Sequence, residues 1–258
     1  MRTLILPLIL VLLMSFSVCT VTLVTSEGTL KLKNGEEIEL GEVHNGALLI
    51  IKALRESEKG IKWDEIKIVE SSLPMYWRAF NNYNIGEKFL EVGIGIPVAT
   101  EPGAYKLKLK LVDNETNYFE TVAIGVVVKK GLLTASLKSI EQPIQGKPFK
   151  IKIEIVNDSI AQRTVQILNS ITSQKKEITI SPKTSYTADI EMVMEDYGRK
   201  EFYITLKSLK DTIYVPITID VSPAVLEKFR PIKQSFGIFA INLLPIYLFF
   251  ELICKCLI

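Results

Sequence analysis

The sequence predicts an all-β protein with two tandem sandwiches and an apolar segment at each end. Apolar and polar residues alternate in many runs between residues 27 and 222, a pattern typical of half-buried strands. Turn residues separate these runs, and little helical periodicity lies between them, as expected for antiparallel sandwiches. No cysteine occurs in this region, so core burial rather than a disulfide framework has to stabilise it.

The first sandwich is predicted over residues 27–130. Its opening run, TLKLKNGEEIEL, alternates on both sides of Asn34-Gly35, a pair that favours a hairpin turn. The further runs are ALLIIKAL, EIKIVE, FLEVGIGIPV, AYKLKLKLV and TVAIGVVVKK. We place the boundary to the next domain near Lys129-Lys130-Gly131.

The second sandwich is predicted over residues 131–222. Its runs are ASLKSI, FKIKIEIVN, RTVQIL, KEITISP, SYTADIEMVM, KEFYITLKSL and TIYVPITIDV. Each of the two regions has about 90 to 105 residues, the size of an immunoglobulin-like domain. The predicted fold class is therefore all-β, with two tandem immunoglobulin-like β-sandwiches, an N-terminal signal or anchor helix and a C-terminal transmembrane helix.

Residues 1–26 have the layout of a secretory signal peptide. Arg2 precedes the apolar run 4–13, and small and polar residues follow it. Cleavage after Cys19 and cleavage after Ser26 both fit this pattern. The alternative is an uncleaved anchor, because apolar character continues to Val24, which gives about 21 residues, enough to span a bilayer.

Residues 235–255 are predicted to form a transmembrane helix, after a linker over 223–234. Its apolar stretch has about the 20 residues that a helix needs to cross the hydrocarbon core. Asn242 and Pro245 lie in its middle and Glu251 lies near its end. In one interpretation Asn242 bonds to backbone groups freed by Pro245. In the other, Asn242 and Glu251 mark a face that packs on another helix in the membrane.

The signal peptide predicts that the sandwiches are outside the cell, with residues 256–258 in the cytoplasm. Lys228, Arg230 and Lys233 precede the span, and the positive-inside rule by itself would favour the opposite orientation. Long domains translocate largely regardless of such charges, so the signal peptide decides. The expected location is the cell membrane, in a single pass.

The residues needed for catalysis or metal binding are scarce. His44 is the only histidine, so we expect no Ser–His or multi-His site, and we interpret His44 as a solvated or capping residue at a turn. The adjacent carboxylates Asp64-Glu65 and Glu195-Asp196 would point to opposite faces of a strand. The net charge is +2 and no basic run or stripe stands out, which argues against nucleic-acid binding. We therefore expect no enzyme activity, no cofactor and no metal.

The segment SSLPMYWRAFNNYNIGEKF is the least sandwich-like part of the chain. Tyr76, Phe80 and Tyr83 recur at helical spacing with Trp77 beside them, which predicts a short helix after Pro74. Aromatic residues of this kind mostly plug the end of a sandwich core. The alternative is an exposed patch that would contact a protein or a sugar. Its four residues are Tyr76, Trp77, Arg78 and Tyr83.

Two N-glycosylation sequons occur, Asn114-Glu115-Thr116 and Asn157-Asp158-Ser159. Both are predicted to lie at turns after a strand, where an acceptor asparagine would be accessible after export. Asn114 and Asn157 are therefore candidate modification sites.

Two stretches resemble a known class of domain. IPVATEPGAYKLKLKLVDN (96–114) has a Pro-Gly turn before an alternating strand, and IQGKPFKIKIEIVND (144–158) has a glycine before a similar strand. Both resemble the immunoglobulin-like repeats of prokaryotic, in particular archaeal, surface proteins with a C-terminal membrane anchor, including cell-adhesion-related and NPCBM-associated types. The resemblance implies extracellular spacing, adhesion or docking, and it brings no catalytic residue.

These observations together predict a non-enzymatic, membrane-anchored extracytoplasmic adhesion, scaffold or docking module. Its expected partners are the lipid bilayer and another membrane or envelope protein, with no nucleic acid, and the oligomeric state stays open. One alternative is an accessory subunit of a membrane complex of translocation or glycosylation type. The other is a carbohydrate-binding module that uses Tyr76, Trp77 and Tyr83.

Overall fold

A computed structural model describes residues 20–25, 28–57, 60–172, 175–209 and 211–224. The described chain is all-β, as predicted, apart from the 3-10 turn η1 (Glu70–Ser72) and the helical residue Ala224 at the end of the last described range. The predicted transmembrane segment 235–255, with Asn242 and Glu251, lies outside the described residues, as do residues 1–19. Within the described ranges no helix has the length and apolar character that would let it cross a membrane.

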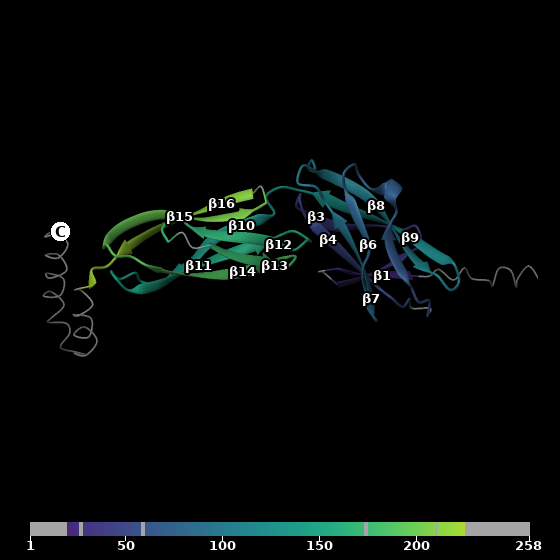
Figure 1. The fold of residues 1–258 in the computed structure, drawn as a ribbon, viewed down its shortest axis with the longest axis horizontal. Helices are drawn as coiled ribbons and strands as arrows, with labels where there is room; N and C mark the ends of the chain where they lie inside the picture. The colour runs from purple at the N-terminus through teal and green to yellow at the C-terminus, as the bar shows by residue number, and fades with distance from the viewer. Residues whose placement is uncertain (1–19, 26–27, 58–59, 173–174, 210, 225–258) are drawn as a thin grey trace, which may run out of the picture. The chain divides into compact units, whose positions relative to one another are not determined.

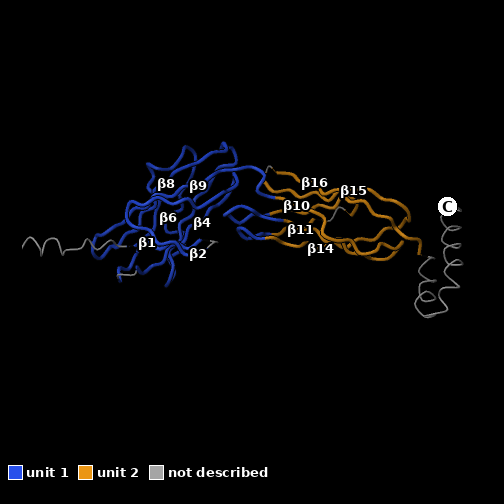
Figure 2. Tube along the Cα trace, turned by 180° about the vertical axis from the view of Figure 1, so that it is seen from behind, with its two compact units in different colours: residues 1–133, 156–164, 179–184 blue, residues 134–155, 165–178, 185–258 orange. Residues whose placement is uncertain are grey.

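The chain divides into two compact units (Figure 2). Unit 1 contains residues 1–133, 156–164 and 179–184, and unit 2 contains the remainder. The predicted boundary at residues 130 and 131 is therefore close to the first division, which follows Leu133. The sequence did not indicate that two later segments belong to unit 1.

The sandwich of unit 1 has two sheets (Figure 1). The five-stranded sheet has the order β2-β1-β4-β7-β6, with β1 (Thr20–Thr25), β2 (Gly28–Lys33), β4 (Leu48–Leu54), β6 (Arg78–Ile85) and β7 (Phe89–Gly95). The four-stranded sheet has the order β3-β9-β8-β5, with β3 (Glu37–Val43), β5 (Glu65–Ile68), β8 (Gly103–Asp113) and β9 (Tyr118–Val128). Strand β3 pairs in parallel with β9. Strands β4, β7 and β6 face β9, β8 and β5 in the arrangement of strands B, E, D and G, F, C of an immunoglobulin fold.

The first sandwich starts earlier than predicted. Strand β1 lies inside the segment 1–26 that the sequence assigned to a signal or anchor, yet it pairs with β2 and β4. Val21 and Leu23 are fully buried in the core, which is the physical reason for the earlier start. Of the two predicted cleavage positions, only the one after Cys19 would leave β1 in the sheet.

The Asn34-Gly35 turn does not close a hairpin. Gly35 has a φ of +80°, as such a turn requires, but β2 and β3 lie in different sheets. The Asn34 side chain accepts a hydrogen bond from Thr121 N at 2.9 Å, and Gly35 N donates to Thr121 O at 2.7 Å. These bonds to β9 carry the chain from one sheet to the other.

Seven further strands form the second sandwich. One sheet has the order β10-β11-β14, with β10 (Leu133–Ile140), β11 (Pro148–Asn157) and β14 (Thr184–Val193). The other has the order β13-β12-β15-β16, with β12 (Arg163–Asn169), β13 (Lys175–Ile180), β15 (Gly198–Ser208) and β16 (Asp211–Val221). This is the A-B-E against C-F-G arrangement of an immunoglobulin-like sandwich, with the fourth strand joined to the C-F-G sheet. Every second residue is buried along β11, along β15 from Phe202 and along β16 from Val215, in agreement with the alternation read from the sequence.

Candidate functional site

Unit 1 exposes an apolar surface along β6 and the turn before it. This surface, the aromatic strip, consists of Met75, Tyr76, Phe80, Tyr83 and Ile85. The exposed fractions of these residues are 76%, 76%, 44%, 48% and 51%. On β6, Phe80 pairs with Gly93 on the outer face of the sheet, whereas Ile85 pairs with Leu90, whose side chain is buried in the core. Several large apolar side chains exposed along one short segment make that segment a candidate interaction site.

The helix predicted after Pro74 is absent. Trp77 N donates to Pro74 O at 3.1 Å in a tight turn, Tyr76 has a φ of +69°, and β6 begins at Arg78. Pairing of β6 with β7 satisfies the backbone here, and this tertiary contact overrides the helical spacing of the aromatic residues.

Trp77 is buried, whereas the residues beside it in the sequence, Tyr76 and Arg78, are exposed. Trp77 is only 6% exposed, and its ring lies 5.0 Å from that of Tyr105. Of the four residues predicted to form an exposed patch, Tyr76, Arg78 and Tyr83 are exposed and Trp77 is not. Trp77 therefore anchors the turn to the core, and it is not available to stack on a sugar.

The Phe80 ring lies on a glycine surface of β7. A Cβ atom added at Gly93 would come within 3.3 Å of Phe80, and one added at Gly95 would come within 3.2 Å of Phe80 Cε2. The two glycines face outward on alternate positions of β7, so the ring lies close against the outer face of the sheet. The sequence analysis used Phe80 only as part of a helical pattern. The Gly-Ile-Gly run of β7 was the signal that could have predicted an aromatic ring lying against this strand.

A bulge in β6 holds the strip in place. The pairing of β6 with β7 shifts between Phe80 and Asn84, and Asn81, Asn82 and Tyr83 lie in this irregular stretch. Asn81 Oδ1 accepts from Ile68 N, and Asn82 Oδ1 accepts from Ile66 N, each at 2.9 Å. Both donors belong to β5, the edge strand of the other sheet. The two side chains thus join β6 to the edge of the second sheet and fix the strand that carries the strip.

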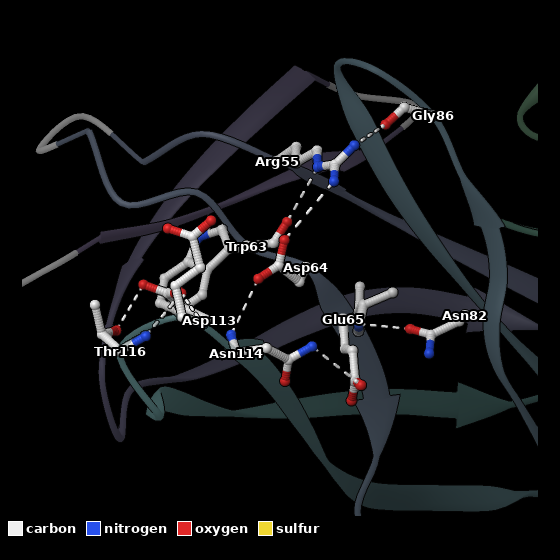
Figure 3. A network of polar contacts seen from close by, with 11 residues as sticks. Arg55, Trp63, Asp64, Glu65, Asn82, Gly86, Asp113, Asn114 and Thr116 are labelled. Atoms are coloured by element: carbon white, nitrogen blue, oxygen red, sulfur yellow. Dashed lines mark hydrogen bonds and ion pairs between the residues drawn. The ribbon is translucent and has the colours of Figure 1, made fainter.

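A polar network ties together the loops at the β8–β9 end of unit 1 (Figure 3). Arg55 donates to Trp63 O and Gly86 O, both at 3.3 Å, and lies 3.7 Å from Asp64 Oδ1. Asp64 Oδ2 also accepts from Asn114 N at 3.0 Å. Asp64 binds Arg55 and the Asn114 backbone, and Glu65 binds Lys67 and the Asn114 side chain, so both carboxylates are engaged in holding loops together.

Two carboxylates of this network have lowered pKa values. The Thr116 hydroxyl donates to Asp113 Oδ2 at 2.6 Å and holds the pKa of Asp113 below its ordinary value. Hydrogen bonds from Lys67 and then from Asn114 lower the pKa of Glu65. Both groups are ionised at neutral pH, where they serve as hydrogen-bond acceptors for the hairpin.

The two sequons lie in different environments. Asn114 is exposed, and its amide makes one hydrogen bond of 3.3 Å to Glu65. Asn157 is fully buried, and its Nδ2 lies 3.0 Å from Ala161 O, 3.3 Å from Ile180 O and 3.0 Å from Ser181 O. The accessible turn expected at Asn157 is therefore not observed, because its side chain closes two loops of unit 1 from within.

His44 is buried, and the expectation of a solvated or capping histidine is wrong. It is 2% exposed, and its Nδ1 lies 3.1 Å from Ser159 Oγ, so the chain does contain a Ser–His contact. Ser159 is 0% exposed and its Oγ also accepts from Ala161 N at 3.1 Å. A substrate could not reach a pair buried this deeply, so the contact is structural. In the described part of the chain, no three His, Cys, Asp or Glu residues are grouped to hold a metal ion.

One strand carries a basic stripe that the sequence analysis did not find. Lys106, Lys108 and Lys110 occupy alternate positions of β8, whose intervening leucines are fully buried. The three lysines therefore lie on the same outer face of the four-stranded sheet. The run KLKLKL was the available signal, but its charges become a stripe only when the strand places them on one side.

Comparison with known proteins assigns no family. No protein-family model and no curated protein matches the chain. Among solved structures, a chimeric titin Z1Z2 is similar at 12% identity, over 80% of this chain and 99% of that one, with a TM-score of 0.38. The D00-D0 domain of intimin is similar at 9% identity, over 77% and 98%, with a TM-score of 0.29. An Escherichia coli alpha-2-macroglobulin is similar at 11% identity, over 71% of this chain and 16% of that one, with a TM-score of 0.32. At TM-scores this low the description of the fold rests on the strand order of the chain itself.

Proposed function

We propose that this protein is a non-enzymatic, membrane-anchored extracytoplasmic module that docks a partner protein through the aromatic strip. The aromatic strip is the single observation that carries this proposal. Phe80 and Tyr83 present large side chains to solvent from β6, which is held by β7 and by the bonds of Asn81 and Asn82 to β5, and Tyr76 does so from the turn before it. Rigid aromatic side chains lose little entropy on binding, and they dominate the binding energy of many protein interfaces.

The rest of the chain supports a binding role. The carboxylates of the polar network are each engaged in binding loops, and the Ser–His contact is buried. The apolar segment 235–255 supports the anchor, and the signal-like segment 1–19 supports export. A partner within the membrane that contacts Asn242 and Glu251 stays a second prediction, which concerns residues outside the described ranges.

The test is co-purification of the tagged full chain from its native membranes. Three proteins are compared: wild type, Tyr76→Ser/Tyr83→Ser on the strip, and Tyr203→Ser/Tyr214→Ser on β15 and β16. Tyr203 and Tyr214 are 56% and 63% exposed, so the second variant removes matched surface aromatic area elsewhere. We expect a stoichiometric partner with the wild type and the control, and its loss from the strip variant. Equal recovery from all three proteins would contradict docking through the strip.

A glycan is a second candidate ligand, and the Phe80 ring on Gly93 and Gly95 favours it. An exposed ring that lies close against a sheet can stack on the apolar face of a sugar. A glycan array probed with the full chain distinguishes the two candidates. Binding that is lost in Phe80→Ala would support the sugar, whereas an array without signal would leave the protein partner as the proposal.

A further inference from the structure

The outer face of the four-stranded sheet in unit 1 carries four lysines close together. Lys106, Lys108 and Lys110 follow one another along β8, and Lys67 on β5 lies directly opposite Lys110 in the pairing of the two strands. On the other side of β8, the residues opposite the three lysines are small: Gly125, Ala123 and Thr121 of β9. Glu39 of β3 pairs with Gly125, and its side chain covers that glycine, so the surface beside Lys106 is occupied. The surface over Ala123 and Thr121, beside Lys108 and Lys110, is lined by small residues.

The sandwich neutralises only part of this charge. Lys106 Nζ lies 2.7 Å from Glu37 Oε1, and Lys67 Nζ lies 2.8 Å from Glu65 Oε2. No carboxylate among the described residues lies within ion-pair distance of Lys108 or Lys110. Like charges placed directly opposite across two strands, such as Lys67 and Lys110, destabilise a sheet.

Lys110 contacts an exposed aromatic ring that a ligand could also contact. Its Nζ lies 3.8 Å from the centre of the Phe119 ring, which is 52% exposed. Val112 pairs with Phe119 at the end of the row and with Glu65 on its other side, so an apolar pair flanked by one carboxylate follows the lysines. The face thus offers two lysines without carboxylate partners beside an exposed aromatic ring.

Strand β3 already provides one carboxylate that binds the row of lysines on β8. Glu37 lies on β3, beyond β9, and reaches across the small residues to bind Lys106. Glu37 and Glu39 both face the outer side from β3, and among the described residues neither lies within ion-pair distance of Lys108 or Lys110. Lysines at alternate positions of a strand are about 6.5 Å apart, and acidic residues at alternate positions of another extended chain have the same spacing.

We infer that this face binds an extended acidic segment of a partner protein, with Asp or Glu at alternate positions. Its carboxylates pair with Lys108 and Lys110, and an apolar residue of the segment contacts Phe119. The two adjacent lysines without carboxylate partners, the matched spacing and the Glu37 contact carry this inference. The face is separate from the aromatic strip, so the inference holds or fails independently of the proposed function.

The test is fluorescence anisotropy with the full chain in a zwitterionic detergent. The probe is a short labelled peptide with glutamate alternating with serine, and the comparison peptide has the same composition with its glutamates in one block. We expect the alternating peptide to bind more tightly. Lys108→Gln/Lys110→Gln should weaken its binding about fivefold, since each exposed ion pair contributes little by itself.

Two further variants make the test specific. Lys150→Gln/Lys152→Gln removes alternate lysines from β11, so it lowers the net charge equally and should leave binding unchanged. Glu37→Gln releases Lys106 and should tighten binding, a gain that a merely structural role of the lysines would not produce.

Three results would overturn the inference. The first is equal binding of the two peptides, and the second is equal weakening by the β8 and β11 variants. The third is binding of a sulfated polysaccharide or of vesicles with an anionic lipid that depends on Lys108 and Lys110 when the alternating peptide does not bind. That last result would assign the face to a glycan or to a lipid surface instead.

Discussion

The Nδ1 atom of His44 lies 3.1 Å from the hydroxyl oxygen of Ser159, 115 residues later in the chain. Both residues belong to unit 1 and both are buried. Next to this contact, Ile160 N donates to Glu42 O at 2.8 Å, and Ala161 lies in the core of unit 1. The segment 156–164 is thus held in unit 1 by hydrogen bonds at its polar residues and by apolar packing beside them.

Ser159→Ala should lower the free energy of unfolding by about 1–3 kcal/mol, because it leaves buried hydrogen-bonding groups without this partner. The affected groups are Ala161 N and His44 Nδ1. Urea unfolding of the full chain measures the change. Ser139→Ala, at an exposed position of β10, is the control and should be neutral. Equal unfolding midpoints for the two variants would show that the Ser159 hydroxyl contributes nothing.

Trp77 and Tyr76 should respond in opposite ways to substitution. Trp77→Ala should cost about 3–5 kcal/mol, because it opens a cavity against Tyr105. Tyr76→Ser should change the free energy of unfolding by less than about 0.5 kcal/mol, since its side chain is 76% exposed. Thermal unfolding monitored by near-UV circular dichroism measures both. A large loss of stability in Tyr76→Ser would contradict its assignment to a binding surface.

Asn82→Gly should speed hydrogen exchange at Ile66 N, because the amide loses the acceptor that protects it. Glycine is chosen because Asn82 has a φ of +49°, which alanine would adopt only with strain. The Asn84 side chain in the same strand makes no such bond, so Asn84→Gly is the control for the added backbone freedom of glycine. Unchanged protection at Ile66 would mean that the edge of β5 is closed by other contacts.

Thr116→Val should raise the pKa of Asp113, since the hydroxyl that stabilises the carboxylate is gone. The pKa of Asp113 is lowered in the folded state, so its contribution to stability is present above the unfolded value and is lost as pH falls through the folded value. The variant should therefore be less stable than the wild type at neutral pH, with the difference shrinking at strongly acidic pH.

Titration of Asp113 by NMR, with unfolding curves at both pH values, checks this prediction. Thr116→Ser keeps the hydroxyl and should behave like the wild type. Protein without glycans is needed, because Thr116→Val also removes the sequon of Asn114. A stability difference that is independent of pH would assign the effect to the methyl group rather than to Asp113.

Glycosylation should occur at Asn114 and not at Asn157. Expression through the secretory pathway of a host that modifies sequons should give a mass increase of one glycan, which Asn114→Gln abolishes. The amide of Asn157 is fully buried and bonded to backbone carbonyls in the folded chain. Glycopeptide mapping identifies the modified residue, and a glycan on Asn157 would show that modification precedes folding of this loop.

The sequence predicted some features of the aromatic strip and not others. Tyr76 and Tyr83 were named from their unusual spacing, and both are exposed. The same spacing predicted a helix, which is wrong. The interpretation that the aromatic residues plug the core holds for Trp77, and the alternative of an exposed patch holds for Tyr76 and Tyr83. The side on which each aromatic residue lies depends on the pairing of β6 with β7 and on the bulge at Asn81 and Asn82. These contacts join residues that local spacing does not relate.

The sequence by itself determined that the described chain is all-β, because alternation of apolar and polar residues is a local property of each strand. It also placed turns at Asn34-Gly35 and at the β8–β9 hairpin, since asparagine, aspartate and glycine favour turn conformations on their own. Only the tertiary structure decided that β2 and β3 join different sheets and that His44 meets Ser159. Tertiary contacts also decided that Asn157 is buried, although its sequon resembles that of Asn114. These features depend on hydrogen bonds and packing between residues far apart in the sequence, and such contacts exist only in the folded chain.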